Sequence, residues 1–122
     1  MNWIALGSLL MALAVAMGAF GAHALKGRLD AYALSVYEKA VFYHFVHALG
    51  ILLVGLLARS NAITPAGQAR VTWLLLIGIV AFSGSLYALA ISGIRMLGAI
   101  TPIGGIAFIA AWALLAYETL RR

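Results

Sequence analysis

The stretch from residue 71 to residue 91 reads VTWLLLIGIVAFSGSLYALAI and contains no charged side chain. An α-helix of about 20 predominantly apolar residues is long enough to cross the hydrocarbon core of a bilayer. Arg70 directly precedes the stretch, where a basic side chain can reach the lipid head groups. This segment therefore predicts a transmembrane helix and places the chain in a membrane.

Three further apolar segments of similar length lie at residues 3–24, 40–58 and 102–120. With residues 71–91 they nearly fill the 122 residues, so we expect one integral membrane domain over residues 1–122. The chain is 66% hydrophobic and 9% charged, whereas soluble domains are about half apolar and a quarter charged. The sequence predicts an all-α fold, a four-helix transmembrane bundle.

The connections between these segments carry signals for helix starts. Asp30 can cap a second helix whose first turns lie at the membrane interface. Thr64 and Thr101 each precede a proline, which suits the first helical position because its missing N–H has no partner there. We therefore expect both threonine hydroxyl groups to cap helices.

The first span could instead be a secretory signal peptide, because Ala22-His23-Ala24 is similar to a small-x-small cleavage site. However, it lacks a basic region before the apolar run, and that run exceeds the usual 7 to 15 residues. We expect the segment to be retained, which the intact mass of the mature protein would test.

Small residues recur at four-residue spacing in three of the spans. They are Ala14, Gly18 and Ala22 in the first, Gly84 and Ala88 in the third, and Ala107 and Ala111 in the fourth. Such rows allow helix backbones to approach closely. We expect contacts within one bundle, and contacts between copies are the alternative.

The charge pattern argues against nucleic-acid binding, because the formal net charge of +5 is scattered rather than concentrated on one face. The end with both termini would hold Arg59, Arg70, Arg121 and Arg122, and the other Lys26, Arg28, Lys39 and Arg95. If Lys26 and Arg95 belong to a site, the positive-inside rule favours cytoplasmic termini. Trp3, Trp73 and Tyr117 would then form an aromatic belt on the inner face. The chain has no cysteine, so it can form no disulfide.

Polar residues converge on one side of the membrane, because antiparallel packing brings together the end of each odd span and the start of each even one. The candidate ligand-binding residues there are His23, Lys26, Glu38, His44, His47, Ser83, Ser85, Arg95 and Thr101. The other half of the bundle interior is expected to be almost entirely apolar or small. Ionisable side chains at membrane depth usually face a bundle interior or a wet cavity.

His44 and His47 lie three residues apart on one helix face, inside the second span. They could hydrogen-bond the serines of the third span, or a backbone carbonyl, as contacts between helices. They could instead line a pocket for a polar head group or small anion, with Lys26 and Arg95 supplying charge. Metal or haem ligation is disfavoured because a histidine pair is only half of a ligand set. We therefore expect no metal and no cofactor.

Arg95 lies between the third and fourth spans. Its side chain could simply extend to the membrane interface, or it could fold back to pair with Glu38 or a bound anion. Matching the depths of the helix ends predicts that His23, His44, His47 and Arg95 form one polar cluster, with both span histidines facing inward.

Several catalytic patterns are absent from the sequence. It contains no P-loop, dinucleotide fingerprint, paired-carboxylate pattern or nucleophile-elbow serine. We therefore expect a protein that binds a lipid, a small polar molecule or a partner subunit, among membrane lipids. A small oligomeric transporter or channel is the alternative, and a lipid-modifying enzyme is a third hypothesis with no specific support.

Four motifs carry a family resemblance that covers almost the whole chain. They are Gly18-Ala19-Phe20-Gly21-Ala22-His23-Ala24-Leu25, His47-Ala48-Leu49, Phe82-Ser83-Gly84-Ser85-Leu86-Tyr87 and Leu97-Gly98-Ala99-Ile100-Thr101-Pro102-Ile103-Gly104-Gly105. Together they resemble the small membrane family called domain of unknown function 423, or UPF0382. The resemblance implies a multi-pass protein of the bacterial inner membrane and transfers no catalytic residue.

Overall fold

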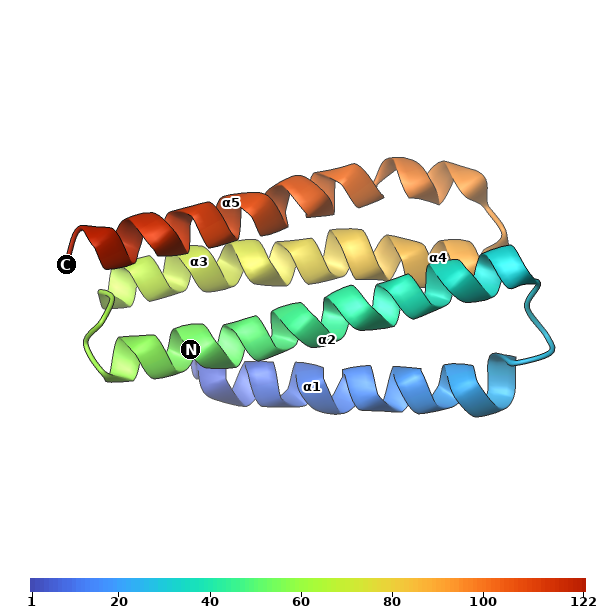
Figure 1. Cartoon of the computed structure of the whole chain (residues 1–122), viewed down its shortest axis with the longest axis horizontal. Coiled ribbons are helices and arrows are strands. Elements are labelled where there is room, and N and C mark those ends of the chain that lie inside the picture. Colours follow the sequence, from blue (N-terminus) through green and yellow to red (C-terminus); the bar gives the residue numbers. More distant parts are fainter.

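A computed structural model of the chain describes all residues from 1 to 122 and consists of four long helical rods (Figure 1). The rods are α1 (Trp3–Phe20) with the π turn η1 (Gly21–Leu25); α2 (Ala31–Arg59); α3 (Pro65–Gly78), the π turn η2 (Ile79–Ser83) and α4 (Gly84–Ser92); and the 3-10 turn η3 (Arg95–Ala99) with α5 (Thr101–Leu120). No strand is present. The predicted all-α, four-helix bundle is confirmed.

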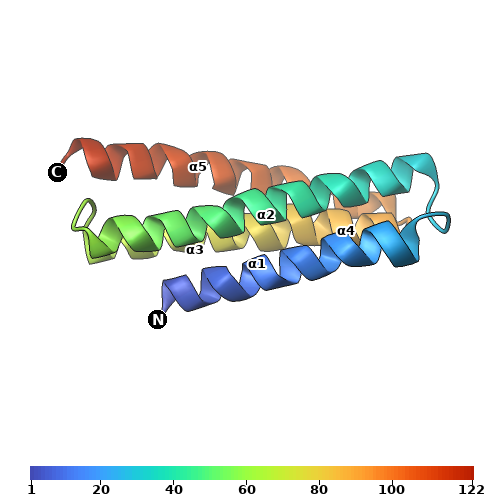
Figure 2. The same cartoon turned by 60° about the horizontal axis from the view of Figure 1, so that its bottom comes forward.

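All four rods are long and apolar enough to cross a membrane. Figures 1 and 2 show that they run antiparallel, with the two chain termini at one end. We call this the terminal end; it also holds the connection at residues 60–64. The distal end holds the connections at residues 26–30 and 93–94. The outer faces carry many exposed large apolar side chains, as contact with lipid requires.

Two of the three expected helix caps are present. The Asp30 carboxylate accepts a hydrogen bond from the Ala33 amide at 2.7 Å, and the Thr64 hydroxyl accepts one from the Gly67 amide at 2.9 Å. The expected cap at Thr101 is wrong. Ile100 already has helical backbone angles and its carbonyl accepts the Ile103 amide, because η3 leads into α5 almost without a break. The Thr101 side chain is therefore free for another contact.

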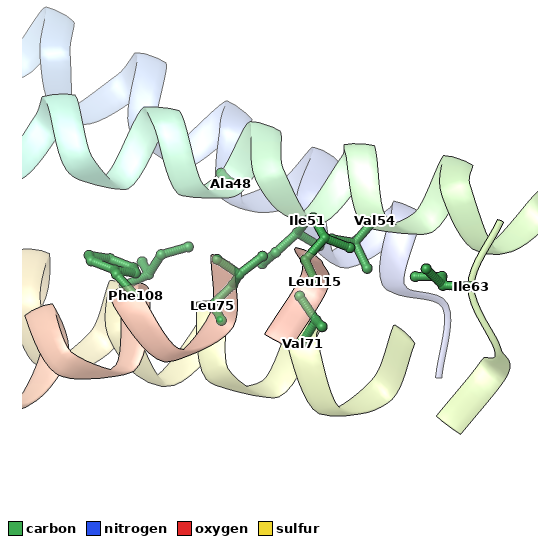
Figure 3. Packing of buried hydrophobic residues seen from close by; sticks show 10 residues of the cluster. Ala48, Ile51, Val54, Ile63, Val71, Leu75, Phe108 and Leu115 are labelled. Atoms are coloured by element: carbon green, nitrogen blue, oxygen red, sulfur yellow. The ribbon is translucent and has the colours of Figure 1, made fainter. Parts of the chain in front are cut away.

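The second and third rods form the centre of the bundle, while α1 packs chiefly on α2, and α5 on α3 and η2. In Figure 3, Ala48, Ile51 and Val54 of α2 face the side chains of the third and fourth rods. The remaining members of this core are Ile63, Val71, Leu75, Ile79, Phe108, Ala111 and Leu115. The main core therefore contains no residue of α1.

Small residues permit the close helix contacts that the sequence predicted. Ala14, Ala107 and Ala111 are buried inside the bundle, whereas Ala22 and Ala88 are exposed. A Cβ atom on Gly104 would lie 2.8 Å from the Phe82 Cα atom, so this position brings α5 against the backbone of η2. The rows thus serve contacts within one chain at their buried positions.

Candidate functional site

A groove of about 340 Å³ lies at the distal end, between the first rod and α2. Its α1 side is built from small residues, Gly18, Gly21 and Ala22, and its α2 side is lined by Leu34, Tyr37, Glu38 and Val41. Lys26, at the first turn of the connection, completes the lining. The groove therefore combines an apolar wall with two charged side chains near the end of the spans.

Tyr37 fixes the floor of this groove. Its ring is buried against Gly21, where a Cβ atom would lie 2.9 Å from the Tyr37 Cδ1 atom. Its hydroxyl donates to the carbonyl of Met17, on the last turn of α1. The absence of a side chain at Gly21 thus lets the tyrosine ring lie against the helix that it hydrogen-bonds.

Lys26 and Glu38 are both exposed and both line the groove, yet no ion pair joins them. The protein has two ion pairs, and Glu118 forms both of them. The charges of Lys26 and Glu38 are therefore not neutralised by any other side chain. A cationic donor and an anionic acceptor are therefore available to the same ligand.

His44 and His47 both face the interior, with exposed fractions of 2% and 6%. The His44 Nδ1 atom lies 2.9 Å from the Tyr87 hydroxyl, and its Nε2 atom has no hydrogen-bond partner. The His47 Nδ1 atom lies 2.7 Å from the Tyr43 carbonyl, and its ring stacks on Phe108. The expected serine partners are wrong for both histidines. His44 contacts a tyrosine of α4, and His47 contacts a backbone carbonyl of its own helix, α2.

The hydroxyl groups near the start of α5 form a separate contact. The Ser85 and Thr101 hydroxyl oxygens lie 2.6 Å apart and join α4 to α5. Ser85 also donates to the Phe82 carbonyl at 3.0 Å. The Ser83 hydroxyl is fully buried and has no partner.

The remaining candidates do not join the histidine pair. Arg95 is exposed and its guanidinium lies over the ring of Tyr32, 5.2 Å from the centroid, instead of pairing with Glu38. A cation over an aromatic face is a favourable contact that needs no carboxylate. His23 is exposed on η1. The structure therefore places the nine candidates in several small groups between the distal end and the middle of the bundle, and not in one hydrogen-bonded cluster.

The terminal end contains a buried charge that the sequence analysis missed. Glu118 is fully buried, and its carboxylate lies 2.5 Å from Arg70 and 2.9 Å from Arg121. It occupies the space above Gly67, where a Cβ atom would be 2.6 Å from the carboxylate oxygen. The expectation of an almost wholly apolar interior in this half is wrong. The sequence did contain a signal for this pair. Antiparallel packing of the third and fourth spans places Arg70 and Glu118 at the same end of the bundle.

No group of three histidine, aspartate or glutamate side chains comes together anywhere in the chain. The buried polar contacts between helices are instead pairs or a triad, such as Ser85 with Thr101 and Glu118 with its two arginines. The groove at the distal end differs from these, because two side chains of opposite charge line it without pairing with each other.

Comparisons with known proteins extend over nearly the whole sequence. A UPF0382 membrane protein of Staphylococcus saprophyticus is 49% identical, over 98% of this chain and 97% of the relative. The UPF0382 membrane protein YwdK of Bacillus subtilis is 44% identical, over 98% and 96%. No solved structure matches the chain. The family described as "Protein of unknown function (DUF423)" matches residues 17–105, which include the groove and both histidines. This chain therefore belongs to the DUF423 family of membrane proteins, whose relatives carry the name UPF0382.

Proposed function

We propose that this protein binds a membrane amphiphile whose head group carries both a phosphate and an ammonium group, in the distal groove. The observation that carries the proposal is that Lys26 and Glu38 line one groove without pairing. A lysine ammonium is a flexible donor to phosphate, and a carboxylate accepts from an ammonium group. Phosphatidylethanolamine has this combination of charges.

The size and position of the groove support this ligand class. A volume of about 340 Å³ lies at the lower end of the range of about 300–1,000 Å³ that ligand pockets occupy. The groove adjoins the last turn of α1 and the first turns of α2, where spans approach the head groups. Gly18, Gly21 and Ala22 give its α1 wall little side-chain bulk, which suits the start of an acyl chain.

The proposal is tested with the full-length protein in nanodiscs of phosphatidylethanolamine and phosphatidylglycerol, followed by native mass spectrometry. Wild-type protein is expected to retain phosphatidylethanolamine. Lys26→Gln and Glu38→Gln are each expected to reduce that retention by about tenfold, since a hydrogen bond to a charged group contributes about 1.5–3 kcal/mol. Lys39→Gln is the control, because Lys39 is exposed and does not line the groove. Equal retention by all four proteins would refute the proposal.

Transport by an oligomer is the second candidate function. Three buried polar atoms in the bundle have no hydrogen-bond partner: His44 Nε2, Thr72 Oγ1 and Ser83 Oγ. Polar groups inside a membrane protein often mark a pathway. This candidate is tested by measuring proton flux into vesicles that contain either wild-type protein or Ser83→Ala. If the flux with wild-type protein equals that into protein-free vesicles, the candidate is dismissed.

We further propose that the protein lies in the bacterial cell membrane with both termini in the cytoplasm. The relatives come from bacteria. Four arginines lie at the terminal end, where Glu118 is the single acid. If the groove is a binding site, Lys26 serves the ligand and leaves fewer basic residues to determine topology at the distal end.

A further inference from the structure

A second cavity, of about 270 Å³, lies at the terminal end between the start of α1, the end of α2 and the start of α3. It is separate from the distal groove and shares no residue with it. Its floor is Gly55, where a Cβ atom would lie 2.6 Å from the Ile4 Cγ1 atom. The Ile4 side chain already fills that direction, so Gly55 allows α1 to pack closely on α2 beside the cavity.

The charge around this cavity is positive and is not neutralised. Arg59 lines it, and no carboxylate does. The other three arginines of the terminal end are engaged: Arg70 and Arg121 by Glu118, and Arg122 by the carbonyl of Asn61. Of these four arginines, only Arg59 has neither an ion pair nor a side-chain hydrogen bond to the protein.

Neutral donors complete the lining. Gln68 and Asn2 both border the cavity, and each carboxamide carries two N–H donors. The Asn2 oxygen is occupied by the Ala5 amide at 3.0 Å, which leaves its NH₂ group free to face a ligand. A guanidinium with carboxamide donors and no acid is a set suited to a phosphate or another oxyanion.

The depth of the cavity identifies the source of that oxyanion. Trp3 lines the cavity and packs edge-to-face on Trp73, with ring centroids 5.4 Å apart. Tryptophan is enriched at the level of the lipid head groups. Because α1 and α2 both enter the apolar core next to the cavity, a lipid phosphate would reach it while its acyl chains stay in the membrane.

We infer that the terminal cavity binds the phosphate of an acidic phospholipid, with Arg59 as the principal ligand. The site does not depend on the proposed function, since it has other lining residues and selects another class of lipid. It provides a contact to the head-group layer at the end of the bundle opposite the distal groove.

The test compares the full-length protein in nanodiscs of phosphatidylglycerol mixed with phosphatidylcholine, with bound lipid counted by native mass spectrometry. Wild-type protein is expected to retain phosphatidylglycerol in preference to phosphatidylcholine. Arg59→Gln should lower that retention by about tenfold, as expected for loss of a charged hydrogen-bonding partner. Arg28→Gln changes the net charge equally at the distal end and should leave it unchanged.

Three outcomes would overturn the inference. The first is equal loss in Arg59→Gln and Arg28→Gln, which would indicate attraction by net charge alone. The second is equal retention of both lipids by wild-type protein. The third is displacement of phosphatidylglycerol by excess inorganic phosphate, which would indicate a site for free phosphate. Glu38→Gln should retain phosphatidylglycerol normally, so a failure of the distal groove would not be mistaken for a failure here.

Discussion

Gly104 and Gly105 are neighbours in the first turns of α5, but their surroundings differ sharply. A Cβ atom on Gly104 would lie 2.7 Å from the Cβ atom and 2.8 Å from the Cα atom of Phe82, in the π turn η2. A Cβ atom on Gly105 would lie 3.8 Å from the edge of the same phenylalanine ring, which is ordinary van der Waals contact. The same substitution, glycine to alanine, should therefore have opposite effects at the two positions.

The expected magnitudes follow from two effects. Replacing glycine by alanine within a helix is favourable by about 1 kcal/mol. At Gly104 the new methyl group would have to displace the backbone of Phe82, and overpacking of this kind costs about 1–3 kcal/mol. Gly104→Ala should thus destabilise the bundle by about 1 kcal/mol on balance, while Gly105→Ala should stabilise it by up to about 1 kcal/mol. The two variants should differ by about 2 kcal/mol.

The assay is reversible unfolding in mixed micelles, with increasing SDS and helicity followed by circular dichroism. Wild-type protein and the two variants are measured at the same detergent ratio. If Gly104→Ala and Gly105→Ala shift the midpoint equally and in the same direction, the close approach of α5 to η2 is not a determinant of stability and the reasoning fails.

Three other results are expected in the same system. Tyr87→Phe removes the hydroxyl partner of a buried imidazole and should cost about 0.6 kcal/mol, the average for hydrogen bonds between membrane helices, and at most about 1.7 kcal/mol; an unchanged unfolding midpoint would contradict the contact. Glu118→Gln leaves two arginines without their shared counter-charge and should lower the unfolding midpoint more than Glu38→Gln, whose exposed carboxylate has no ion pair. Single cysteines replacing Asn61 and Arg28 should label from opposite sides of intact cells, and equal labelling would contradict four spans.

The parts of the structure that the sequence predicted are those decided by local chemistry. Asp30 and Thr64 cap helices because the chain on either side of each residue determines the cap. Thr101 has the same local sequence signal, but the 3-10 turn before it already supplies helical geometry, so its hydroxyl bonds Ser85 on another helix. A pattern of a few residues cannot reveal that a preceding turn has taken over the capping role.

The partners of buried polar groups depend on how each helix is rotated about its axis. His44 faces inward, but a shift of one turn along the neighbouring rod decides whether it meets Ser83 or Tyr87. Glu118 similarly lies near the end of its helix, and its burial arises only because α3 supplies Arg70 and the bare backbone of Gly67. Hydropathy gives the spans, and their alternation gives which span ends lie together, but the angular positions of the helices come from packing.

The position of α1 at the edge of the bundle has a consequence for ligand exchange. The ten buried residues of the main core come from the other three rods and from the connection at residue 63, while α1 covers this core from outside with the partly buried Leu10 and Met11. The same helix is one wall of the distal groove. The groove thus has one wall on a central helix and one on a peripheral helix, and the hydrogen bond from Tyr37 to Met17 joins the two walls. If the groove binds an amphiphile as proposed, its entry from the bilayer would require α1 to move away from α2 and this hydrogen bond to break.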